Sequence, residues 1–291
     1  MSASDHKEAL QTNGYTVVRE ALAPSEIGAL RRSIARFLER GDDSRYLYNG
    51  IFKSQVFVPS PDDVFLPLLT HERLTPVLRE LAGDSVTFLT EMGIAANTAA
   101  GWHKDTHGLQ PFDTTSARDF GVYKVLIYPQ DHLGMNEADF ALKVRVGSHW
   151  MSRVEDGDEA SLFIRAGDAI IMDVRLTHRG HKDLVEGKSL AARALYSPFR
   201  RYAPVATYSA TSHIRRLLGR RDRYLVTLLF AKYNDHTAAY IRAGREVTKQ
   251  RWPETLTTAE LPSHWAERLA SAGVRYIDGA ELNGRGPIVD E

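Results

Sequence analysis

Residues 120–128 read FGVYKVLIY and residues 168–174 read DAIIMDV, two short apolar runs rich in β-branched and aromatic side chains. Runs of this length and composition are typical of strands in the core of a sheet. Four similar runs lie along the chain around them: VTFLTEMGIA (86–95), FALKVRV (140–146), SLFIR (161–165) and LAARALYSPF (190–199). Turn residues separate these runs and no long helical pattern intervenes. The section from about residue 86 to 199 therefore predicts a sandwich or barrel.

The sequence on either side of this section favours helices. Residues 4–41 predict a helix, a strand-like run and a second helix that opens at Pro24, and residues 66–82 predict another that ends at Gly83. From Ser209 to Trp252, apolar residues recur in three- and four-residue steps, a spacing typical of helix.

We therefore expect one mainly β domain in three parts. Residues 1–85 pack helices and a strand on the barrel, residues 86–200 form the catalytic core, and residues 201–291 form a C-terminal helical extension. The extension is expected either to cover the barrel mouth or to form a homodimer contact.

Composition excludes several functional classes. The chain has 37 basic and 37 acidic residues, so it has no strong overall field to hold nucleic acid. It has no cysteine, which excludes disulfide frameworks, zinc fingers, iron–sulfur clusters and thiol nucleophiles. The first residues have no apolar core like that of a signal peptide, and the run Tyr224–Ala231 is shorter than the ~20 residues of a membrane span. We expect a cytoplasmic protein with no membrane span.

The residues that suggest chemistry lie in Gly101-Trp-His103-Lys-Asp105. In an extended chain, residues two apart project to the same face, so His103 and Asp105 can hold one ion together. His178, near the end of an apolar run, is the expected third ligand. Two imidazoles and one carboxylate form the facial triad of non-haem Fe(II) oxygenases, which leaves positions open for a bidentate co-substrate and dioxygen.

Context selects this pair from three occurrences of His-x-acid in the sequence. His6 and Glu8 lie in an expected helix, where residues two apart diverge. His181 and Asp183 lie in a polar turn. Only His103 and Asp105 lie within the β-rich section and have a partner histidine near a later strand.

Arg193 is the candidate anchor for an anionic co-substrate. It lies in an alternating strand and shares a face with Ala191 and Leu195. A guanidinium that points into an apolar barrel is costly unless it meets an anion, and a dicarboxylate held on the metal would supply one. The alternative is an arginine that faces solvent across the sheet.

Taken in order, these motifs resemble the phytanoyl-CoA dioxygenase family. They are WHKDTHG (102–108), KVLIYPQDH (124–132), VGSHW (146–150), RAGDAIIMDVRLTHRG (165–180) and the arginine strand. The resemblance extends over roughly residues 53–199. It implies a double-stranded β-helix (a jelly roll, cupin-like) with flanking helices, and an oxygenase that depends on Fe(II) and 2-oxoglutarate.

The resemblance also implies roles for individual residues. His103, Asp105 and His178 would be the iron ligands, Arg193 would bind the distal carboxylate of 2-oxoglutarate, and Lys53 would lie near the co-substrate. Met92 and Lys124 align with pocket-wall positions.

Two departures from the family pattern bear on these roles. Gly180 replaces a frequent serine, and fifteen residues separate His178 from Arg193, so Lys188 is a rival anchor. His149 is expected to be structural and not a fourth ligand.

The implied reaction uses Fe(II), 2-oxoglutarate and O2, with ascorbate as a helper in vitro, and releases succinate and CO2. Asp105 favours hydroxylation, desaturation or ring closure over halide transfer, because related halide-transferring enzymes have a small residue at that position. We expect a small-molecule, lipid or secondary-metabolite substrate. Two alternatives stay open: a metal-dependent jelly-roll isomerase or binding module that does not use dioxygen, and a non-catalytic sugar-binding jelly roll, which should have lost a ligand.

Overall fold

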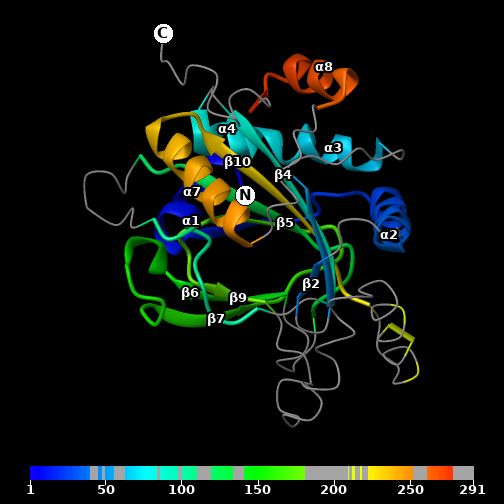
Figure 1. Ribbon diagram of the computed structural model, residues 1–291, viewed down its shortest axis with the longest axis horizontal. Helices are drawn as coiled ribbons and strands as arrows, with labels where there is room; N and C mark the ends of the chain where they lie inside the picture. The colour runs from blue at the N-terminus through cyan, green and yellow to red at the C-terminus, as the bar shows by residue number, and fades with distance from the viewer. Residues whose placement is uncertain are drawn as a thin grey trace.

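Two β-sheets form the centre of the computed structural model (Figure 1). The structure describes residues 1–39, 45–47, 50–55, 63–83, 86–97, 100–109, 119–133, 141–180, 209, 212–213, 217, 222–251 and 261–277. The larger sheet has the strand order β1-β8-β5-β10-β4-β3-β2, with β11 paired to β4, and the smaller sheet has the order β7-β6-β9.

The strands of the larger sheet are β1 (Tyr15–Val18), β2 (Arg45–Leu47), β3 (Gly50–Gln55), β4 (Val86–Ala96), β5 (Val122–Ile127), β8 (Ala169–Asp173), β10 (Tyr224–Lys232) and β11 (Arg275–Tyr276). Those of the smaller sheet are β6 (Leu142–Val146), β7 (Asp158–Leu162) and β9 (His178–Arg179). After β5 the chain moves to the smaller sheet, returns for β8, crosses again for β9 and ends this pattern with β10. This alternation between two facing sheets is that of a jelly roll, which confirms the predicted fold class.

The helices are α1 (Ala3–Asn13), α2 (Pro24–Glu39), α3 (Leu66–Leu69), α4 (Thr75–Ala82), α7 (Asp235–Arg251) and α8 (Ser263–Ser271), with short 3-10 turns η1 (Asp63–Phe65) and η4 (Ser148–Trp150). Ser2 and Asp5 form a capping box at the start of α1. The helix ends at Gly14, whose φ of 84° favours glycine. A Cβ at Gly14 would lie 2.6 Å from Leu176 Cδ1, so glycine also permits the close approach of α1 to the chain before His178.

Apolar side chains on both faces of the larger sheet form the core. On one face, Phe88, Val125 and Ile171 belong to a cluster with residues of α2, α4 and α8, including Leu30, Val77 and Trp265. On the other face, strand residues pack against the smaller sheet in a second cluster: Leu126, Leu142, Val144, Leu162, Ile170 and Met172. Because it is covered on both sides, β8 is buried at every residue.

The helical prediction for residues 209–252 is wrong over Tyr224–Lys232. This run forms β10, a central strand between β5 and β4. It is apolar on nearly every residue because both of its faces are buried, and such a run fits helical spacing as well as strand spacing. The helix predicted over residues 66–82 is confirmed in position but divides into α3 and α4, and α4 ends at Gly83 as expected.

The helix α7 packs at one end of the space between the sheets. Its Tyr240 and Ile241 join a third cluster with Leu89, Val122 and Leu229. Within the described part of the chain, none of the helices has the length and apolar character needed to cross a membrane.

Candidate metal centre

Three predicted ligands come from two chain segments that pair antiparallel. His103 and His178 form a β-bridge in which each backbone N–H donates to the other carbonyl at 3.0 Å. Asp105 N donates to Val174 O at 2.9 Å. The pairing holds the segment with His103 and Asp105 against the one that leads to His178, so residues 75 positions apart in sequence become neighbours.

The side chains of these residues converge on one point. His103 Nε2 lies 3.4 Å from Asp105 Oδ1, and His178 Nε2 lies 3.4 Å from Asp105 Oδ2. One ligand atom from each residue lies within 4.8 Å of the other two. Among the described residues, no other group of three or more His, Cys, Asp or Glu side chains meets this criterion.

The backbone fixes which nitrogen each imidazole presents. His103 Nδ1 lies 2.7 Å from Gly101 O, and His178 Nδ1 lies 2.9 Å from Leu176 O. A carbonyl only accepts hydrogen bonds, so each Nδ1 carries the hydrogen and each neutral ring has its lone pair on Nε2. This arrangement orients a histidine as a metal ligand.

The electrostatic environment keeps Asp105 and His178 in forms that bind a cation. Burial, with His103 close by, lowers the pKa of His178 to about 3, so this ring is neutral at physiological pH. Burial opposes ionisation of Asp105, but Lys124, His178 and His103 together outweigh it and hold the pKa of this carboxyl well below 3.8. Burial also opposes protonation of His103, but Asp105 and the Gly101 carbonyl together outweigh it and raise the pKa of this ring, so a cation that binds here would compete with a proton.

A family model for phytanoyl-CoA dioxygenase (PhyH) matches residues 10–184 of the sequence. The chain belongs to the phytanoyl-CoA dioxygenase family. A search of curated proteins returned no match to the sequence. The assignment of the chain to this family therefore rests on the family model.

Several solved structures share the fold. The non-haem, α-ketoglutarate-dependent epimerase SnoN from nogalamycin biosynthesis is 15% identical, the match covers 79% of this chain and 83% of SnoN, and the TM-score is 0.56. The carbocyclase SnoK from the same biosynthesis is 15% identical over 80% and 87% of the two chains, with a TM-score of 0.54. HygX from Streptomyces hygroscopicus, solved with nickel, 2-oxoglutarate and hygromycin B, is 15% identical over 78% and 86%, with a TM-score of 0.54.

As a phytanoyl-CoA dioxygenase family member, the chain is a non-haem iron enzyme that uses 2-oxoglutarate. The donor set fits such a metal, because two imidazole nitrogens and one carboxylate leave other coordination positions open. This agreement rests on the family and on the chemistry of the side chains, which are independent observations.

Of the predicted pocket residues, the structure brings Lys124 to the triad. Lys124 lies on β5, and its Nζ donates to Asp105 Oδ2 at 2.7 Å. Met92 lies elsewhere: on β4 it is aligned with Leu228, which is aligned with Val125, and all three belong to the helix-side cluster. Lys124 is aligned with Met172 of the inner cluster, on the opposite face of the sheet. Met92 is therefore not a wall of the pocket around the triad.

Other predicted residues lie at or beyond the limits of the description. Lys53 is in β3 with its backbone aligned with Ile94, but its side chain lies outside the described structure. Arg193, Lys188, His181 and Asp183 also lie outside the described residues.

His6 and His149 have structural contacts. His6 Nδ1 lies 2.8 Å from Thr16 Oγ1 in the interface of α1 with β1. His149 Nε2 donates to Gln11 O at 3.1 Å, at the end of α1. Neither belongs to the group of three ligands.

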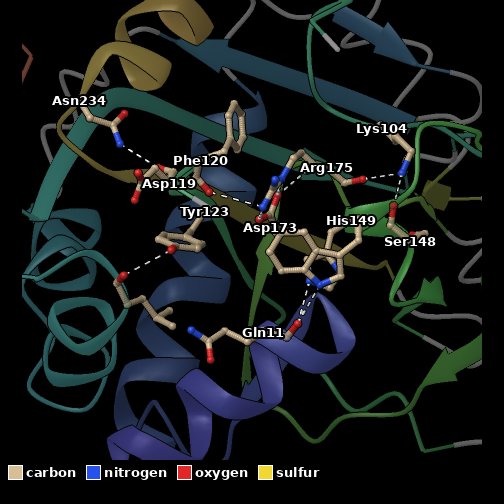
Figure 2. A network of polar contacts seen from close by, with 12 residues as sticks. Gln11, Lys104, Asp119, Phe120, Tyr123, Ser148, His149, Asp173, Arg175 and Asn234 are labelled. Atoms are coloured by element: carbon tan, nitrogen blue, oxygen red, sulfur yellow. Dashed lines mark hydrogen bonds and ion pairs between the residues drawn. The ribbon is translucent and has the colours of Figure 1, made fainter. Parts of the chain in front are cut away.

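Sequence reasoning missed a buried polar network behind the triad (Figure 2). The Arg175 side chain is 2% exposed and pairs with Asp173 through Nε–Oδ1 at 3.0 Å and Nη2–Oδ2 at 2.7 Å. Its guanidinium also lies 4.8 Å from the Phe120 ring centroid and 5.0 Å from that of Trp150. The alternation Asp173-x-Arg175 just before a ligand histidine was the available sequence indication.

Proposed function

We propose that this protein is an Fe(II)- and 2-oxoglutarate-dependent oxygenase that hydroxylates, desaturates or cyclises a small-molecule, lipid or secondary-metabolite substrate. His103, Asp105 and His178 are the proposed iron ligands, and Arg193 is the proposed anchor for 2-oxoglutarate. The observation that carries the proposal is the convergence of three donor atoms within 4.8 Å in a member of the phytanoyl-CoA dioxygenase family.

In this proposal the protein residues prepare the site before any ligand enters. The carbonyls of Gly101 and Leu176 hold each Nδ1–H, so the two Nε2 lone pairs face Asp105. The ammonium of Lys124 pairs with Asp105 and helps to keep this carboxylate ionised when water is excluded from the site. When bound, iron with 2-oxoglutarate and dioxygen supplies the oxidising power to cleave a substrate C–H bond.

Lys124 and Arg193 are proposed to bind the co-substrate by charge. Lys124 adjoins the triad from the sheet, and an anion chelated to the metal would reduce the cost of burying this ammonium. Arg193 would take the far carboxylate, for which its planar guanidinium suits bidentate pairing.

The substrate class is proposed by likeness. SnoN, SnoK and HygX share the fold, and SnoN was solved with nogalamycin RO and HygX with hygromycin B. The inner face of the barrel carries buried apolar side chains beside the triad and Lys124, among them Leu126, Val144 and Met172. Such a lining excludes water from a reacting C–H bond and suits a ligand with apolar surface.

Turnover of 2-oxoglutarate tests the proposal. The protein is incubated with Fe(II), ascorbate and 2-oxoglutarate, with and without a panel of polyketide, aminoglycoside and acyl-thioester substrates, and succinate is measured. We expect succinate that depends on Fe(II) and rises with a true substrate. Metal-dependent conversion of a substrate without O2 consumption would instead support an isomerase, and the oxygenase proposal would be wrong.

A further inference from the structure

Lys104 lies between the two proposed ligands His103 and Asp105, but its side chain goes to a different place. Its Nζ donates to Ser148 O at 2.6 Å and to Arg175 O at 2.7 Å, as Figure 2 shows. Because side chains alternate along an extended chain, Lys104 points away from the face that carries the two ligands. The ammonium therefore acts on the back of the site.

Both carbonyls belong to segments that hold His178. Arg175 is three residues before His178, and the Ser148 hydroxyl accepts a hydrogen bond from Thr177 N, the residue just before it, at 2.8 Å. One ammonium thus connects the His103–Asp105 segment to both sides of the approach to His178. It supplements the backbone hydrogen bonds of His103 and Asp105.

The segment that Lys104 binds is itself fixed. The Arg175 guanidinium is paired with Asp173 and lies between two aromatic rings, and Leu176 N donates to Asp173 O at 2.9 Å. The neighbouring Trp150 Nε1 donates to Gln11 O of α1 at 3.0 Å. Lys104 therefore holds the His103–Asp105 segment against a part of the chain that is itself fixed by these contacts.

Trp102 anchors the same segment on the other side of His103. Its ring lies 4.7 Å from the Arg145 guanidinium and 5.1 Å from that of Arg179, the residue after His178. Trp102 and Lys104, which alternate with the ligands, thus both contact residues next to His178 in the chain or in the strand that pairs with it. The ligands occupy one face of the segment and its anchors occupy the other.

We propose that Lys104 is a positioning residue that sets the distance between the His103–Asp105 pair and His178, without contacting the metal, 2-oxoglutarate or substrate. The proposal rests on the proposed function, because it takes these three residues as the iron ligands. Metal sites tolerate only small displacements of their ligands, and loss of a supporting contact typically weakens metal binding by about 10- to 100-fold.

The test compares Lys104→Met, which keeps the length and apolar stem but removes the charge, with Lys104→Arg, which keeps a donor for two carbonyls. Fe(II) dissociation constants are measured anaerobically with saturating 2-oxoglutarate from the absorption of the chelate. The Tm of each metal-free protein is measured in parallel. Lys143→Met is the matched control, because Lys143 is also a buried lysine of this region and its ammonium pairs with the Glu159 carboxylate of β7.

We expect Lys104→Met to raise the Fe(II) dissociation constant by about 10- to 100-fold, Lys104→Arg to recover part of this loss, and Lys143→Met to change it less than about threefold. Wild-type affinity in a folded Lys104→Met protein would overturn the proposal. An equal loss in Lys143→Met would also overturn it, because the effect would then be general.

A further variant and the wild-type protein provide two more tests. If Lys104→Met does not fold, Lys104→Gln keeps a neutral donor at this position, and a raised Fe(II) dissociation constant is expected; unchanged affinity would overturn the proposal. Failure of the wild-type protein to bind Fe(II) with 2-oxoglutarate would instead refute the proposed function on which it rests.

Discussion

The two sheets of the barrel differ in how they are held together. The larger sheet is covered on both faces by apolar side chains, and β8 has no exposed residue. The smaller sheet is apolar only on its inner face, and its other face carries Lys143 paired with Glu159, and Arg145 and Arg179 on Trp102. The proposed ligands attach to the smaller sheet through β9. Apolar burial therefore stabilises the fold, whereas specific polar contacts position the proposed ligands.

The largest expected effect separates metal binding from folding. His103→Ala, Asp105→Ala and His178→Ala should each weaken Fe(II) binding by about 100-fold or more, because a facial triad has no spare ligand. The apolar core does not depend on the ion, so the metal-free fold should persist by circular dichroism. His6→Ala, a histidine bonded to Thr16, should bind Fe(II) normally. Normal binding by His178→Ala would show that the distal ligand is another residue, with His181 the first alternative.

The second prediction concerns the buried ion pair behind the site. Arg175→Met leaves Asp173, which is 2% exposed, without its partner, and should reduce the free energy of unfolding by about 3–5 kcal/mol. Lys143→Met leaves Glu159 41% exposed and hydrated, and should cost about 1 kcal/mol or less. Urea denaturation measures both. Equal losses would mean that the two polar clusters are not distinct in their energetic roles.

A third prediction perturbs only the larger sheet. Ile171→Ala removes a fully buried side chain of β8 and should reduce the free energy of unfolding by about 2–5 kcal/mol through the cavity it leaves. Since Ile171 faces the helices and not the triad, the folded variant should keep the Fe(II) affinity of the wild type. Loss of Fe(II) affinity in this variant would contradict the separation of fold from site.

The smallest expected effect concerns the co-substrate. Arg193→Ala should raise the KM for 2-oxoglutarate by about 10- to 100-fold, which corresponds to about 1.4–2.8 kcal/mol. Lys188→Ala, in a polar turn of the sequence, should change it less than about threefold. Arg193→Lys should recover only part of the loss, since an ammonium does not reproduce a bidentate fork. A larger change for Lys188→Ala would reassign the anchor to that residue.

The sequence predicted the fold and the grouping of His103, Asp105 and His178, because both follow from short-range regularities. Alternation placed His103 and Asp105 on one face, and the apolar runs placed them in a barrel with His178. The contacts of Lys104 escaped prediction because its acceptors are backbone carbonyls, which every residue possesses. The burial of Arg175 escaped because its aromatic neighbours come from distant segments.

The irregular pairing of β10 with β4 was also beyond the sequence. Between β10 and β4 the register shifts at Leu228 to Phe230, so one residue of β10 faces three of β4. Thr90, inside this irregularity, has a φ of 57°, which is unusual for a β-branched residue. The irregularity adds two residues to β4, so the alternation is preserved and Met92 lies on the same face as Phe88 and Ile94. Tyr224–Lys232 was misassigned because a strand buried on both faces has no alternating pattern.

The position of the bound iron tests directly whether His103, Asp105 and His178 are its ligands. Crystals grown anaerobically with Fe(II) and 2-oxoglutarate, measured on both sides of the iron absorption edge, locate the metal by its anomalous scattering. We predict one dominant anomalous peak, within about 2.2 Å of His103 Nε2, His178 Nε2 and a carboxylate oxygen of Asp105. A dominant peak at other side chains, with none between these three, would contradict it.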